Sequence, residues 1–401
     1  MNLKPSLNRA PIRTRYQGRS IDRRSVIGST LAGLAAAATA GRFTGPALAQ
    51  TPAAIPVSAG RLNVRPNAAT LNADQKRAYV DAVLALKAKP SPWVDSLSTY
   101  DTFVMWHRDA FGCGINAAHM GPAFFPWHRV FLHLFEQQLQ AVDASVSLPY
   151  WDWATDRATD SYVWQDDFMG GDGSDADDEA VVTGPFQKGK WELTVFDYSD
   201  TQRTSWITRD LGMGGLAPDL PTADDVEAAL AVPSYDAEPW SAQSAPAESF
   251  RNTFEGWRDC VEDMCDPTAG AGTICTGEHL LHNRVHLWVS GEFAFSHELQ
   301  GQVMIMDSST PAPAGDMVLG TMAANSSPND PVFFLHHANI DRLWSVWAAR
   351  HGQRYLPESG GPVGHNIDDM MWPYHQIGMD VSPRMVLDSR AFGYVYDSET
   401  P

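Results

Sequence analysis

The stretch "NDPVFFLHHANIDRLWSVW", residues 329–347, places two adjacent histidines, His336 and His337, among Phe, Leu, Ile and Trp side chains. It predicts a helix in which Asp330 is the N-cap and Pro331 takes the first helical position. Such a helix is apolar on nearly every face, which is typical of a central helix. Imidazole is costly to bury unless a partner satisfies its nitrogens. At least one of the two histidines is therefore expected to have a partner in the core, and helical phase does not decide which.

A helix predicted to begin at Pro126 separates two further histidines by phase. His128 lies on an apolar stripe with 3.6-residue spacing, whereas His133 falls on the side that carries Glu136 and two glutamines. We therefore expect His128 to point into the core and His133 to face solvent. His119 lies in the loop just ahead of this helix.

Two more predicted helices carry inward histidines. In the segment 99–111, His107 has a phenylalanine four residues before it and another four residues after it. His282 and His286 are four residues apart, so both project from one helical face and can share a metal ion. A core histidine bonded to a backbone carbonyl is the simpler interpretation of any one of these residues. Five or six inward histidines on four helices, without Cys or carboxylate, instead favour Cu, Zn or Ni.

The histidine segments resemble a known family. "HMGPAFFPWHRVFLHLFE" (119–136) and "DPVFFLHHANID" (330–341) closely resemble the two copper signatures of the tyrosinase family. "FEGW" (254–257) and "LHNRVHLWVSG" (281–291) resemble the segment that leads into its second copper site, and the resemblance spans roughly residues 95–350. It implies a mainly α fold, an antiparallel four-helix bundle that holds two copper ions, with long irregular loops.

The resemblance also implies three histidine ligands for each copper ion. The implied ligands are His107, His119 and His128 for copper A, and His282, His286 and His337 for copper B. His336 is then expected to be a packed neighbour that needs a hydrogen-bond partner of its own.

Three other positions bear on the activity that the resemblance implies. Asn283 resembles the residue that helps to hold a water which deprotonates monophenols, and Glu255 resembles its acidic partner. Because 26 residues separate Glu255 from His282, Glu278 is a possible substitute, and a surface carboxylate is the alternative interpretation of Glu255. Ala324 falls where plant catechol oxidases carry a bulky gate over copper A, and a small residue there implies access for phenols.

The implied function is a copper-dependent phenol oxidase that uses O2 as co-substrate. Such an enzyme hydroxylates small monophenols at the ortho position and oxidises o-diphenols to o-quinones. One alternative is an o-diphenol or o-aminophenol oxidase without monophenolase activity. The others are an oxygen carrier like the haemocyanins and a histidine core without metal. A copper-delivery chaperone is a possible protein partner.

Residues 1–49 predict an export signal, and residues 50–401 are then the catalytic domain. A basic region with the pair Arg23 and Arg24, a small-residue apolar run and a final Ala-Leu-Ala favour the twin-arginine route to the periplasm or the medium. A Sec signal or a disordered tail is the alternative. Removal of this segment takes away eight basic residues and one acidic residue, so the formal net charge changes from -19 to -26. So negative a protein is not expected to bind nucleic acid or anionic membranes.

The cysteines favour disulfides in an exported protein. Three of the four lie within residues 260–275, and three pairings are possible if all four are used. The four are Cys113, Cys260, Cys265 and Cys275.

Overall fold

The structure is a computed structural model, and its description covers residues 62–111, 117–194, 204–213, 217–256, 281–294 and 317–399. The predicted export segment, all four cysteines and Glu278 lie outside these residues.

Most regular structure in the described residues is helical. The α-helices are α2 (Ala73–Ala88), α3 (Thr99–Ala110), α4 (Phe124–Gln140), α5 (Ala223–Leu230), α6 (Phe250–Glu255), α7 (Leu281–Ser290) and α8 (Val332–His351). Short strands form three pairs: β1 (Asn63–Arg65) with β6 (Tyr394–Tyr396) in parallel, and β2 (Gly173–Ser174) with β3 (Ala180–Val181) and β4 (Glu292–Ala294) with β5 (Met317–Leu319) antiparallel. The predicted mainly α fold with long irregular loops is confirmed.

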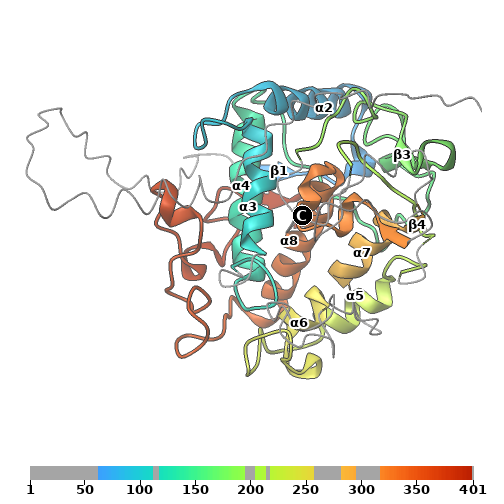
Figure 1. The fold of residues 1–401 in the computed structure, drawn as a ribbon. Helices are drawn as coiled ribbons and strands as arrows, with labels where there is room; N and C mark the ends of the chain where they lie inside the picture. The colour runs from blue at the N-terminus through green and yellow to red at the C-terminus, as the bar shows by residue number, and fades with distance from the viewer. Residues whose placement is uncertain are drawn as a thin grey trace, which may run out of the picture. The chain divides into compact units, whose positions relative to one another are not determined.

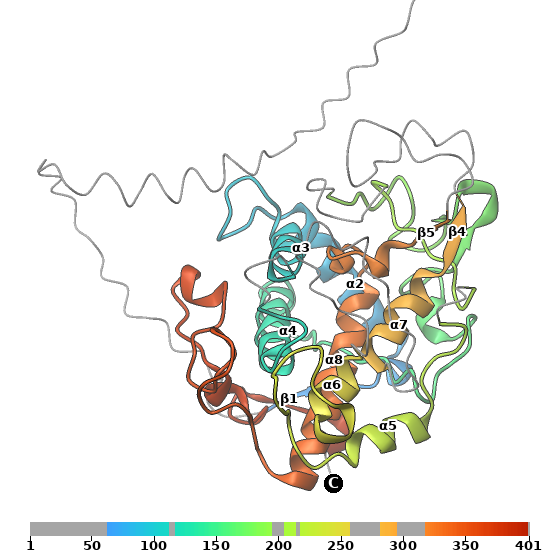
Figure 2. The ribbon, with the colours of Figure 1, turned by 60° about the horizontal axis from the view of Figure 1, so that its bottom comes forward.

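Four helices surround the predicted copper ligands. α3 packs beside α4, and α4 contacts α8. Figures 1 and 2 both show α8 between α4 and α7. These helices carry every predicted ligand except His119, which lies in the loop before α4.

Local signals set the first turns of α2 and α3. Asn72 caps α2 and forms a reciprocal capping box with Gln75, and the helix stops before Pro90. Ser98 caps α3 by accepting the Asp101 N–H at 2.9 Å. Both helices thus begin where a side chain satisfies a first-turn N–H.

The predicted starts of α4 and α8 are each wrong by one or two residues. α4 begins at Phe124, two residues before Pro126. A proline is tolerated at the third helical position, because the N–H that it lacks would have no acceptor within the helix. α8 begins at Val332, and Pro331 takes the cap position predicted for Asp330. The carboxylate of Asp330 accepts the Val332 N–H at 3.2 Å and also binds buried Arg209.

The prediction that His133 faces solvent is wrong. Its side chain is buried, its ring lies 4.6 Å from that of Phe392 between centroids, and its Nε2 lies 2.9 Å from the Gln137 amide nitrogen. Glu136 on the same side is also buried and binds Arg65. The C-terminal segment and β1 cover this face of α4, and such long-range packing leaves no trace in helical phase.

Residues 160–240 are rich in Gly, Asp and Pro without sustained periodicity, which predicts long surface loops, but they are not all exposed loop. They contain α5, and Trp164, Phe168 and Trp191 are buried in the hydrophobic core. Absence of periodicity indicated irregular backbone correctly, but aromatic side chains on irregular backbone still bury apolar surface.

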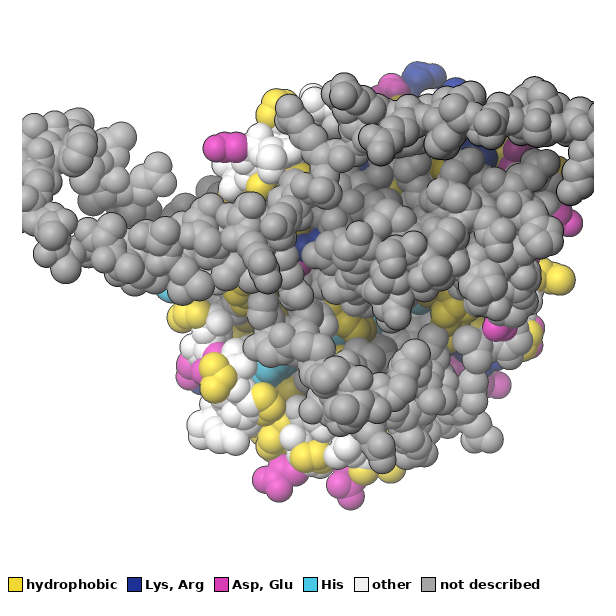
Figure 3. Space-filling model, in the orientation of Figure 1, with side chains coloured by type: hydrophobic (Ala, Val, Ile, Leu, Met, Phe, Trp, Pro, Cys, Tyr) yellow, Lys and Arg dark blue, Asp and Glu magenta, His cyan; other side chains and the backbone are white. Residues whose placement is uncertain are grey.

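The described residues expose charged side chains, and their helices include no candidate membrane span. In the face shown in Figure 3, acidic side chains lie scattered around the margin. Within the described ranges, each helix is too short or too polar to cross a bilayer.

Candidate dicopper site

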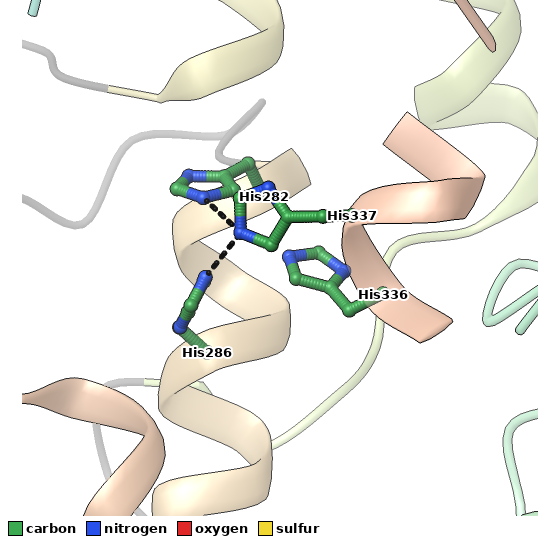
Figure 4. A group of neighbouring side chains, drawn as sticks. All are labelled: His282, His286, His336 and His337. Carbon is green, nitrogen blue, oxygen red and sulfur yellow. Dashed lines mark hydrogen bonds between the residues drawn. The ribbon is translucent and has the colours of Figure 1, made fainter. Parts of the chain in front are cut away.

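Imidazole nitrogens gather into two clusters in the core. In each cluster, one nitrogen from every ring lies within 4.8 Å of the others. The clusters are His107, His128 and His337, and His282, His286, His336 and His337. Figure 4 shows the second cluster, in which two histidines from α7 face two from α8. His337 belongs to both clusters and lies at their junction.

The spacing in the second cluster suits a bound metal ion. His337 Nε2 lies 3.3 Å from His282 Nε2 and 3.2 Å from His286 Nε2. Metal–nitrogen bonds of about 2.0 Å at tetrahedral angles hold their nitrogens about 3.3 Å apart. Neither cluster includes Cys or carboxylate, and an all-imidazole set suits copper among the common metals.

Hydrogen bonds at the outer nitrogen orient four of the rings. In each case Nδ1 faces an oxygen acceptor, so Nδ1 carries the hydrogen and Nε2 keeps the lone pair that a metal needs. The pairs are His107 with Asn325 O (2.7 Å), His128 with Phe124 O (2.8 Å), His286 with Met322 O (2.6 Å), and His282 with Asn283 Oδ1 (2.8 Å). Among the described residues, Nε2 of His107 and of His128 has no hydrogen-bond partner. Buried polar atoms of this kind are rare unless they bind something, so these two also fit a metal ion.

Burial keeps the clustered histidines neutral. It lowers the pKa of His107 to about 3 and the pKa of His286 to about 4. The pKa values of His119, His128 and His337 also lie well below 6.5, because burial and then the neighbouring imidazoles disfavour the charged form. Neutral rings are the form that binds a metal ion.

His119 lies beside the first cluster. Its ring centroid is 4.8 Å from that of His107 and 5.0 Å from that of His128, but its nitrogens are not part of either cluster. His336, in contrast, belongs to a cluster although it is not a predicted ligand. Expected only as a packed neighbour, it stacks on the His282 ring at 5.4 Å between centroids and shares the cluster with the predicted copper B ligands.

Asn283 and Glu255 make contacts that the sequence did not predict. Asn283 Oδ1 fixes the tautomer of His282, as its 2.8 Å contact shows. Glu255 is fully buried, so its interpretation as a surface carboxylate is wrong. One carboxylate oxygen accepts the Met120 N–H at 2.6 Å and the other accepts a hydrogen bond from Arg251 at 3.1 Å.

Ala324 lies in the sequence between two residues whose carbonyls orient predicted copper ligands. The Met322 carbonyl accepts from His286 in one cluster, and the Asn325 carbonyl accepts from His107 in the other. One short segment thus orients a ring in each cluster. These acceptors could not be predicted from the sequence, because any residue can supply a backbone carbonyl and no side-chain pattern marks it.

Comparisons with known proteins agree with this geometry. The family described as "Tyrosinase: Common central domain of tyrosinase" matches residues 97–350. The chain is 38% identical over 345 residues to the tyrosinase of Streptomyces lincolnensis, with 84% of this chain and 100% of that protein covered. It is 37% identical to the tyrosinase of Streptomyces glaucescens, with the same coverage.

A solved structure shares the fold. The polyphenol oxidase of Thermothelomyces thermophila superposes with a TM-score of 0.54 at 21% sequence identity, covering 84% of this chain and 88% of that one. Together with the match over residues 97–350, the paired imidazole clusters make the conclusion plain: the chain belongs to the tyrosinase family.

Proposed function

We propose that this protein is a copper-dependent oxidase of small phenols, which hydroxylates monophenols at the ortho carbon and oxidises o-diphenols to o-quinones. The observation that carries the proposal is the pair of buried, neutral imidazole clusters that meet at His337. A copper pair, when bound there, supplies O2 binding and joint two-electron oxidation. The proposed ligands are those that the resemblance to the family implies: His107, His119 and His128 for copper A, and His282, His286 and His337 for copper B.

The chain's own residues orient the histidine rings and exclude water from around them. The carbonyls of Met322 and Asn325 hold one ring of each cluster, and Phe333 packs face to face on His337 at 4.0 Å between centroids. Rings that are fixed before the metal binds lose little freedom on binding it. Burial keeps bulk water from competing for the nitrogens.

The experiment that tests the proposal uses the purified, copper-loaded chain. We expect about two copper ions per chain by metal analysis, and O2 uptake with tyrosine and with catechol. Oxidation of catechol without oxidation of any monophenol would support the o-diphenol or o-aminophenol oxidase. A chain that takes up no copper, or that binds O2 reversibly without oxidising catechol, would contradict the proposal.

Hydroxylation of monophenols is the finer part of the proposal, and the resemblance of Asn283, Glu255 and Ala324 to the family positions that bear on this activity supports it. A general base that removes the phenol proton contributes about 100-fold or more to a rate. We expect Asn283→Asp or Glu255→Gln to lower the ratio of monophenol to diphenol oxidation by at least about 10-fold, because each substitution should remove much of this contribution. Parallel O2-uptake assays on tyrosine and catechol measure the ratio. Asn67→Asp, outside the histidine clusters, is the control, and an unchanged ratio at full copper content would remove both residues from this role.

Ala324 is proposed to leave copper A open to phenols. Its side chain is a single methyl group on the segment whose carbonyls orient His107 and His286. A small residue at that position is consistent with access to the first cluster.

Export by the twin-arginine route is also proposed, with residues 1–49 as the cleaved signal. The pair Arg23 and Arg24 ahead of a small-residue apolar run supports it. Joint replacement of both arginines by lysine is expected to retain the protein in the cytoplasm, and export at the normal rate would contradict this. Because this route carries folded proteins, a copper-delivery partner before export is part of the proposal. Full copper content in the chain expressed alone at low copper would argue against that partner.

A further inference from the structure

The loop that joins His119 to α4 has an unusual backbone. Met120, the residue after His119, has a φ of 56°, in the left-handed region that residues other than glycine rarely adopt. Ala123 at the start of α4 has no side chain that could cap the helix. The conformation of residues 120–123 therefore depends on contacts from elsewhere in the fold.

Three buried side chains from distant parts of the chain supply those contacts. Glu255 accepts the Met120 N–H at 2.6 Å, and the Tyr235 hydroxyl donates to the Pro122 carbonyl at 2.5 Å. His365 Nδ1 accepts the Ala123 N–H at 3.1 Å. The three residues lie 135, 113 and 242 positions along the chain from the groups that they hold.

His365 also packs directly on the loop. A Cβ atom added at Gly121 would lie 2.6 Å from His365 Cε1 and 2.7 Å from its Nδ1, so only glycine allows this contact. The position of His365 is itself fixed, since its carbonyl accepts from the Tyr355 hydroxyl at 2.8 Å and its N–H donates to Pro362 at 3.1 Å. His365 lies beyond residue 350, where the family match ends.

His119 depends on this support more than its partners do. The rings of His107 and His128 are each oriented by a hydrogen bond from their own Nδ1. Within the described ranges, His119 Nδ1 has no hydrogen-bond partner. With no such hydrogen bond, the direction of its ring is set by packing against neighbouring rings and by the backbone that carries it, and that backbone is held by the contacts just described.

We propose that His365 is a positioning residue for copper A, which acts with Tyr235 by fixing the loop that aims His119 and begins the helix of His128. The inference rests on the proposed copper site and extends it to a histidine outside the ligand set. Glu255 belongs to the same arrangement, but its proposed part in monophenol oxidation makes it unsuitable for the test. His365 and Tyr235 carry no such second role.

The test measures how firmly each copper ion is held. The copper-loaded protein is dialysed against a series of chelator concentrations, and copper per chain is determined by atomic absorption. We expect His365→Ala to lose one of its two ions at a chelator concentration at least about 10-fold below that needed for the unmodified protein, the lower end of the effect of an outer partner on metal affinity. The second ion should leave at its usual concentration. His365→Asn, whose amide oxygen can take the place of Nδ1, should restore the lost affinity.

Tyr235→Phe tests the same idea with less disturbance of folding and should weaken the same ion to a smaller extent. Tyr100→Phe is its matched control, because the Tyr100 hydroxyl is equally buried and donates to the Pro328 carbonyl, also at 2.5 Å. The control should leave copper retention unchanged.

Coupling between His365 and Gly121 provides an independent readout. Gly121→Ala should weaken one copper ion in the unmodified chain and have little further effect once His365 is alanine. Additive effects would overturn the proposal, as would equal weakening of both ions in His365→Ala with no rescue by asparagine. An unmodified chain that binds no copper would instead refute the proposed function, so the two failures are distinguishable.

Discussion

Replacement of His337 by alanine is expected to abolish phenol oxidation, because it removes a proposed ligand of copper B. It should also weaken copper A, because the His337 ring stacks on that of His128 at 4.4 Å between centroids. His337 Nε2 lies within 3.3 Å of two nitrogens of the second cluster, and the same ring belongs to the first cluster. Loss of an outer partner of a metal ligand already costs up to about 100-fold, and loss of the ligand itself costs more. We therefore expect the rate of catechol oxidation to fall by more than about 100-fold.

Two other substitutions make this result specific. His128→Ala should also abolish activity but should leave one copper ion in place, because His128 belongs to only one cluster. His133→Ala removes another buried histidine of α4, whose ring packs on Phe392, and it should leave activity and copper content nearly unchanged. Metal analysis and O2 uptake distinguish the three variants. Two tightly held copper ions in His337→Ala would show that the shared position of this ring has no role in binding.

Local signals in the sequence were enough to predict the helices that carry the clustered histidines. The i, i+4 pair on α7 and the apolar stripe through His128 depend only on helical geometry. The caps of α2 follow from neighbouring side chains. Phase could not choose between His336 and His337, and the structure places both in one cluster.

Features made by distant residues could not be predicted in this way. His133 and Glu136 are buried because the C-terminal segment and β1 cover them, over 200 and 70 residues away along the chain. The carbonyls that orient His107 and His286 are backbone atoms, which carry no sequence signal. His365 occurs in an irregular segment, and nothing in its neighbourhood along the chain connects it with the loop that it holds.

The largest expected effect on stability comes from Asp341, which joins both ends of the described chain to the central helices. Its carboxylate accepts hydrogen bonds from Arg129 at 2.6 Å, from the hydroxyls of Tyr394 and Tyr396 at 2.5 and 2.6 Å, and from Arg65 at 3.3 Å. Every one of these side chains is buried. Asp341→Asn keeps the size of the side chain but removes the charge that balances the buried guanidinium of Arg129 and that adds to Glu136 in balancing Arg65. Removal of one partner from a buried ion pair costs about 3–5 kcal/mol of unfolding free energy, and we expect a loss of this size.

The pH dependence of that loss identifies its cause. Burial alone would raise the pKa of Asp341, but the charges of Arg129 and Arg65 and the two tyrosine hydroxyls outweigh it, so this pKa lies below its usual value of 3.8. A depressed pKa contributes stability that is complete above the unfolded value of about 3.9 and is lost as the pH falls through the folded value. Denaturant unfolding should therefore show a constant gap between the unmodified protein and Asp341→Asn from pH 5 to 7, and a narrowing gap below about pH 4. Asp368→Asn, in an exposed pair with Arg384, is the control and should show no comparable loss. A gap that widened in acid would mean that the charge of Asp341 does not stabilise the fold.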